Sequence, residues 1–302
     1  MQNHKKLGTA LAILAAALYA LNAPFSKQLL QHAGPTMMAA FLYLGAGLGL
    51  ILYSLGEKAL GKRPDRAPLT KAELPYTFAM ILLDIAAPIL LMLGITRTTA
   101  ANASLLNNFE IVATSLIALF IFKEHISRRL GGAIVLVTVA SMILGFESGG
   151  GITFDLGSLF VLGACVCWGF ENNCTRMLSS KSSVQITVIK GCFSGLGSLI
   201  VALILKESIP DPVYILGILA LGFVAYGLSI NFYIMAQSHL GAAKTSAFYS
   251  IAPFLGVLFS MVLGERPGLQ FYLGLLVMGF ATWLMVRDTL DIFGTDGKTS
   301  EE

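Results

Sequence analysis

Two apolar stretches of equal length decide the fold: residues 100–124, AANASLLNNFEIVATSLIALFIFKE, and residues 241–265, GAAKTSAFYSIAPFLGVLFSMVLGE. Each stretch ends in a glutamate, Glu124 in the first and Glu265 in the second. A helix needs roughly 20 apolar residues to cross the hydrocarbon core of a bilayer, and both stretches are long enough. When the two are aligned without gaps, the glutamates coincide. The pattern therefore predicts a duplicated membrane-spanning helix.

The whole chain has the composition of an integral membrane protein. Of its 302 residues, 56% are hydrophobic and 12% are charged, whereas about 25% are charged in ordinary soluble proteins. A soluble domain of this size cannot bury that much apolar surface in one core. The net charge is only +3, and no basic run fits a nucleic-acid backbone. Composition therefore excludes a soluble enzyme and a nucleic-acid-binding protein.

Ten apolar stretches are long enough to cross a bilayer, which predicts an all-α membrane protein with ten transmembrane helices. They cover residues 7–30, 36–55, 74–95, 100–122, 130–146, 156–177, 184–205, 213–236, 242–263 and 269–286. Lysine and arginine concentrate in cytoplasmic loops, so their distribution sets the orientation. When the N-terminus is placed in the cytoplasm, only four of the 20 lysine and arginine residues lie on the external side: Lys27, Arg97, Lys206 and Arg266. Lys190 falls within a span. Both termini are therefore predicted to be cytoplasmic.

The two halves of the chain match each other beyond the opening stretches. Aligning the first span with the sixth places Asn22 on Glu171, and Gly-x-x-x-Gly pairs recur in the second and seventh spans, beginning at Gly45 and Gly191. Glycines at this spacing let helix backbones approach closely in lipid. They indicate either static packing or a sliding seam between the halves.

Five spans in each half is an odd number, so the two halves are predicted to sit upside down relative to each other. The first repeat would cover residues 1–147, the second repeat residues 152–287, and a disordered cytoplasmic tail residues 288–302. Inverted repeats give a protein two related shapes, each open to one side of the membrane.

Three features carry a family resemblance: the five-plus-five arrangement, the two stretches that end in glutamate, and the Trp168–Gly169 step in the sixth span. With these features the chain resembles the EamA family of the drug/metabolite transporter superfamily over nearly its whole length. It departs from the family pattern at Ile111, where a proline often follows the glutamate. The resemblance implies a secondary transporter of the plasma membrane (the inner membrane of a bacterium), often an exporter of metabolites or amino acids.

Four ionisable residues lie within the predicted spans, where each costs at least roughly 2.5–3.5 kcal/mol at the centre. They are Asp84, Glu110, Glu171 and Lys190. Glu171 and Lys190 lie at similar depth on consecutive helices. They either form a buried ion pair, or Lys190 snorkels to the surface and leaves Glu171 free. Asp84 and Glu110 have no evident partner. Each is either a protonated carboxyl group bonded between helices or a carboxylate that binds a cation or proton.

Asparagines and aromatic rings lie at similar depth and complete the predicted substrate site. The asparagines, expected to orient the solute, are Asn22, Asn107 and Asn108, and the rings are Tyr19, Trp168, Phe170, Tyr226 and Tyr249. Rings beside carboxylates can hold an ammonium group by cation–π attraction of roughly 2 kcal/mol when desolvated. The alternative for each ring is ordinary core packing.

Three buried acids against one base favour a small cationic or zwitterionic solute over an anion. We therefore expect a secondary transporter that works by alternating access, with protons as a candidate coupling ion. A channel or a lipid-binding scaffold is the alternative. An intramembrane enzyme has less support, because no nucleophile with a matching base lies at membrane depth. No catalytic residue, cofactor or metal site is predicted, and the expected partners are the solute and the lipid bilayer.

Overall fold

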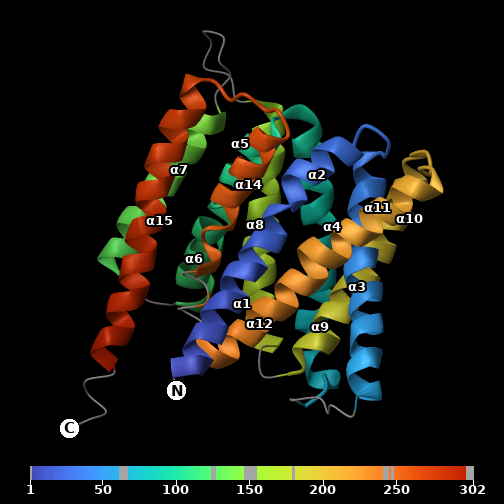
Figure 1. Cartoon of the computed structure of the whole chain (residues 1–302), viewed down its shortest axis with the longest axis horizontal. Helices are drawn as coiled ribbons and strands as arrows, with labels where there is room; N and C mark the ends of the chain where they lie inside the picture. Colours follow the sequence, from blue (N-terminus) through green and yellow to red (C-terminus); the bar gives the residue numbers. More distant parts are fainter. Residues whose placement is uncertain are drawn as a thin grey trace.

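The computed structural model describes residues 2–60, 67–123, 127–145, 155–178, 181–240, 245 and 248–296, and every element in these ranges is helical. The helices lie side by side in one bundle (Figure 1). The α-helices are α1 (Gln2–Ala20), α2 (Asn22–Leu29), α3 (Pro35–Ala59), α4 (Leu74–Arg97), α5 (Ala100–Leu106), α6 (Phe109–Phe122), α7 (Arg128–Gly145), α8 (Leu156–Leu178), α9 (Ser183–Ile189), α10 (Gly195–Ile204), α11 (Pro212–Gly222), α12 (Ser229–Leu240), α14 (Ala252–Val262) and α15 (Leu269–Asp296). A 3₁₀ turn, η1 (Lys71–Glu73), precedes α4, and two π-helical segments, η2 (Lys190–Ser194) and η3 (Phe223–Leu228), interrupt the second half.

Within the described ranges, six helical stretches are long and apolar enough to cross a membrane. They cover residues 6–29, 35–59, 71–97, 100–121, 184–204 and 212–233, and shorter apolar helices follow at 252–262 and 269–284. Large apolar side chains face outward, among them Leu52, Ile204 and Val262, the last 83% exposed. Helices satisfy their own backbone hydrogen bonds, so such a surface is stable in lipid but not in water. The chain is therefore an all-helical, multi-pass membrane protein.

The two halves of the chain are interleaved. The most extensive helix pairs each join the first half to the second: α4 packs on α8, α7 on α15, α1 on α12, α3 on α10 and α11, and α5 on α14. The core therefore runs between the halves, and residues far apart in sequence meet at the centre of the bundle.

Glycines set the spacing of α3 against its two neighbours from the second half. A Cβ on Gly191 would lie 2.5 Å from the backbone nitrogen of Gly47, and a Cβ on Gly45 would lie 2.2 Å from the carbonyl oxygen of Leu219. Gly222 faces α3 in the same way, with a carbonyl oxygen 2.0 Å from the Cβ position. The glycines recognised in the sequence thus bring helix backbones into direct contact, as close packing in lipid requires.

Several helices are interrupted midway, and the sequence explains the interruptions. Pro24 has no N–H to donate to the carbonyl group of Ala20, and α1 ends there before α2 begins. Pro253 stands in the first turn of α14, a position that proline favours, after a turn at residues 250–251. Two consecutive asparagines, which have low helix propensity, separate α5 from α6.

The start of α1 and the end of α15 lie at the same end of the bundle (Figure 1). The last helix continues to Asp296, beyond Val286, where the last apolar stretch of the sequence ends. Residues 297–302 of the predicted tail lie outside the described residues, as does Glu124.

Candidate functional site

A small cavity lies where three interrupted helices meet. It is lined by Tyr19, Ala20, Asn22 and Ala23 from the α1–α2 junction, by Ser104 and Asn107 from α5 and its end, and by Ala252, Pro253 and Gly256 from α14. Its volume is about 10 Å³, roughly the space of one water molecule. Discontinuous helices that meet in this way expose backbone groups that can bind solutes or ions.

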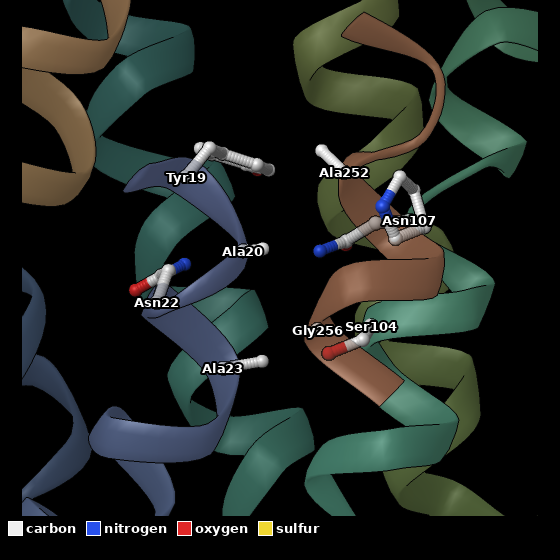
Figure 2. A pocket seen from close by; sticks show the side chains of 9 residues that line it. Tyr19, Ala20, Asn22, Ala23, Ser104, Asn107, Ala252 and Gly256 are labelled. Carbon is white, nitrogen blue, oxygen red and sulfur yellow. The ribbon is translucent and has the colours of Figure 1, made fainter. Parts of the chain in front are cut away.

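The α5 side of the cavity carries polar groups that lack partners. Figure 2 shows the hydroxyl group of Ser104 and the side chain of Asn107 directed toward the α1–α2 junction, where Tyr19, Ala20 and Ala23 lie. The Ser104 hydroxyl is buried and has no hydrogen-bond partner among the described residues. The same holds for both amide atoms of Asn108, which follows the cavity-lining Asn107 but does not itself line the cavity. Buried polar atoms are nearly always hydrogen-bonded, so these groups are suited to hold a polar ligand or water.

A chain of tyrosine rings runs from this cavity into the bundle. The ring centroids of Tyr19 and Tyr226 lie 5.8 Å apart, and those of Tyr226 and Tyr43 lie 5.3 Å apart. On the other side, the ring of Tyr19 lies 5.9 Å from that of Tyr249. The amide nitrogen of Asn22 donates to the hydroxyl oxygen of Tyr226 at 2.8 Å. Four tyrosines and an asparagine from both halves of the chain thus form one connected cluster.

An ionic cluster lies beyond the tyrosines. The ammonium nitrogen of Lys190 lies 3.2 Å from Asp84 Oδ2 and 3.1 Å from Glu171 Oε2. Both carboxylates are at most 1% exposed. Pro88 follows Asp84 by four positions in α4 and cannot donate to its backbone carbonyl group, which loosens this turn. Lys190 opens η2, so a π-helical turn presents the ammonium group between the two acids. Two acids share one base at this point.

Tyr43 joins the ionic cluster to the tyrosines. Its hydroxyl group donates to Asp84 Oδ1 at 3.0 Å, and the indole nitrogen of Trp168 donates to the Tyr43 oxygen at 3.4 Å. Its ring contacts Tyr226, which in turn accepts the hydrogen bond from Asn22. A continuous path of contacts therefore connects Lys190 with the cavity.

Glu110 belongs to a separate part of the site. Its carboxylate accepts a hydrogen bond of 2.7 Å from the amide nitrogen of Asn172 on α8. Asn172 also donates to Thr114 at 3.3 Å, and neighbouring Asn173 donates to the backbone of Gly169 at 2.8 Å. The acid is thus held in the interface of α6 and α8, one turn from Asn107.

The expectation that Asp84 lacks a partner is wrong, because Lys190 reaches it from the second half of the chain. Glu110 also has a partner, in Asn172. Phe170 was expected at the centre, but it is 40% exposed and faces outward. Tyr43 was not predicted from the sequence. It lies in the middle of an apolar span, and the same position marked Tyr19, Tyr226 and Tyr249 as candidates.

These residues form a polar, aromatic and acidic centre inside an otherwise apolar helical bundle, where ionisable groups are costly and mark a candidate functional site. The chain belongs to the EamA-like transporter family, whose model matches it twice, over residues 6–146 and 155–287.

The relatives are also named as transporters. An uncharacterized transporter from Methanothermobacter thermautotrophicus is 26% identical over 274 residues, which cover 84% of this chain and 78% of the relative. The uncharacterized transporter YyaM from Bacillus subtilis is 22% identical over 255 residues, which cover 79% of this chain and 80% of the relative. A solved crystal structure shares the fold with a TM-score of 0.64 at 16% identity, covering 93% of this chain and 95% of the other. The protein is therefore a membrane transporter.

Proposed function

We propose that this transporter is a secondary carrier that moves a small cationic or zwitterionic organic solute across the plasma membrane by alternating access. In this proposal ten helices cross the membrane as two inverted repeats, residues 1–147 and 152–287, with both termini in the cytoplasm. The recurrence of the family match over two consecutive stretches supports the repeat.

The observation that carries the solute class is the charge balance at the centre. Asp84 and Glu171 share one ammonium group, and the carboxylate of Glu110 accepts a hydrogen bond from the neutral amide group of Asn172. With all four groups ionised, the described centre has more negative than positive charge, which favours a cationic group and disfavours a phosphate or a lone carboxylate.

The solute would bind beside the tyrosine cluster. Tyr19 and Asn22 line the cavity, and Tyr226 and Tyr249 adjoin it. Aromatic faces attract ammonium groups, and the amide groups of Asn107 and Asn108 can orient a polar tail. As the transporter opens the centre to one side of the membrane and then to the other, Asp84 and Glu171 would bind and release a proton. Either acid would also make and break its contact with Lys190. Protons are thereby the proposed coupling ion.

The test is charge movement in sealed proteoliposomes on a solid-supported membrane. Amines, amino acids and quaternary ammonium compounds are applied with and without a pH gradient, and a saturable current for one class is expected. Glu171→Gln should abolish it, whereas the matched control Glu73→Gln, whose acid pairs with Lys181 just before the start of α4, should keep it. Silence of the whole panel in both current and tracer-flux measurements would refute the solute class, and an unchanged current in Glu171→Gln would refute the role of that acid.

A further inference from the structure

Glu265 joins α14 to α5 at the end of the bundle opposite the N-terminus. Its two carboxylate oxygens accept hydrogen bonds from the backbone nitrogens of Ala100 and Ala101, both at 2.8 Å. These are the first two amides of the 100–121 span, where an anion interacts favourably with the helix dipole. Charged hydrogen bonds of this kind are stronger than neutral ones. One side chain from the second half is thus held by two amides of the first half.

The end of α14 is shaped to direct this side chain. Gly264 has a backbone φ of +98°, which residues with a side chain rarely adopt. Its backbone nitrogen donates to the carbonyl oxygen of Met261 at 3.0 Å, and that of Glu265 donates to the carbonyl oxygen of Ser260 at 3.1 Å. These bonds form a Schellman-type helix end, which turns the chain sharply. Glu265 is thereby turned back over the start of α5.

The two helices joined by Glu265 also enclose the cavity. α5 ends at Leu106 and α14 begins at Ala252, so each is a short rod that stops at a mid-bundle interruption. Between the interruptions and Glu265 the rods touch closely: a Cβ on Gly256 would lie 3.0 Å from the Cβ atom of Ser104. α5 and α14 together form the wall of the cavity that faces α1 and α2 (Figure 2), so separating them would open this wall toward the end where Glu265 joins them.

We propose that Glu265 is the latch of a gate formed by α5 and α14, and that its release from the two amides opens the cavity toward this face of the membrane. The gate rests on the proposed alternating-access function, which requires such an opening. The hinges are the interruptions after Leu106 and before Ala252, and the rods swing apart at the ends that Glu265 holds together.

A second acid with the same geometry provides a matched control. Glu207 follows Lys206, which has a φ of +56°, and accepts from the backbone nitrogens of Thr36 at 3.2 Å and Met37 at 2.7 Å. It therefore caps α3 at the same end of the bundle. The residues that line the cavity come from α1, α2, α5, α14 and their junctions, and α3 contributes none of them. Loss of this contact should leave the gate closed.

The test is side-resolved thiol labelling of the full-length protein. Ala23→Cys is introduced as a reporter in a background in which Cys165, Cys167, Cys174 and Cys192 are replaced by alanine or serine. A membrane-impermeant maleimide is added to intact cells and, separately, to inverted vesicles. In Glu265→Gln, labelling from the side where α5 begins should become about tenfold faster, which corresponds to about 1.4 kcal/mol. In Glu207→Gln it should stay at the parent rate.

A second variant keeps Glu265 and fixes the rods instead. In Ser104→Cys/Gly256→Cys, oxidation forms a disulfide that holds α5 and α14 together, so labelling of the reporter from that side should be suppressed. A reducing agent should restore the labelling. Unchanged labelling in a folded Glu265→Gln, an equal rise in Glu207→Gln, or free labelling of the oxidised pair overturns the latch. If Glu265→Gln does not reach the membrane, the disulfide pair decides the question. Solute transport measured on the same proteins separates the two proposals: faster labelling with neither current nor tracer flux for any solute of the panel upholds the latch and refutes the solute class.

Discussion

Removing the ammonium group of Lys190 should destabilise the protein more than any other single change at its centre. Lys190→Met keeps the length of the side chain but leaves Asp84 and Glu171 buried without their counter-ion. At about 3 Å and an effective dielectric constant near 20, each pair contributes about 5 kcal/mol of attraction. Desolvation of the charges offsets much of this, and removing one partner of a buried ion pair costs about 3–5 kcal/mol.

The assay is unfolding of the purified protein by sodium dodecyl sulfate, followed by tryptophan fluorescence. The double variant Lys190→Met/Asp84→Asn removes one unpaired acid and should recover a large part of the loss. Lys181→Met is the control, because Lys181 lies 3.3 Å from Glu73 in a pair whose acid is 17% exposed, and it should change stability little. Equal stability of the two lysine variants, or a double variant no better than Lys190→Met, would refute the account of the ionic cluster.

Four further substitutions test the packing and the polar contacts. Gly222→Ala places a methyl group 2.0 Å from a carbonyl oxygen of α3, and the overpacking should lower the free energy of unfolding by at least about 1–3 kcal/mol. In Gly56→Ala the added methyl group meets open space, so this change should stabilise the helix by about 0.5–1 kcal/mol. The same unfolding assay compares the two variants. Tyr226→Phe removes the acceptor of the Asn22 amide and should cost about 1–3 kcal/mol; a stability equal to the parent would show that this bond is not formed in the membrane. Asp155→Ala removes the oxygens that accept from two backbone nitrogens at the start of α8 and should cost about 1 kcal/mol, measured as a shift of the unfolding midpoint.

The sequence predicts the helical membrane class well, because long apolar stretches have few alternatives in a bilayer. Glycine spacing also predicts close helix contacts, and the structure confirms them at Gly45 and Gly191. The pairing of helices between the halves could not be derived in the same way. It depends on which faces fit together, and nearly uniform apolar stretches carry little information about their faces.

The candidate site illustrates this limit. Asp84 and Lys190 are far apart in sequence, so an estimate of depth for consecutive helices could not pair them. Trp168 and Phe170 were predicted together, but two positions along a helix differ by about 200° around its axis. Trp168 therefore faces the centre and Phe170 faces outward. Depth could be read from the sequence, whereas the direction around each helix required the packed structure.

The two π-helical segments set the second half of the chain apart from the first. They occur in the second half, whereas α3 and α4 in the first half are α-helical throughout. A π turn holds one residue more than an α turn, and one inserted residue shifts the helix phase by about 100°. Lys190 and Tyr226 both lie in these turns. The second half therefore presents an ammonium group and a tyrosine at the centre of the bundle from these wider turns, whereas the described helices α3 and α4 of the first half contain no such turn.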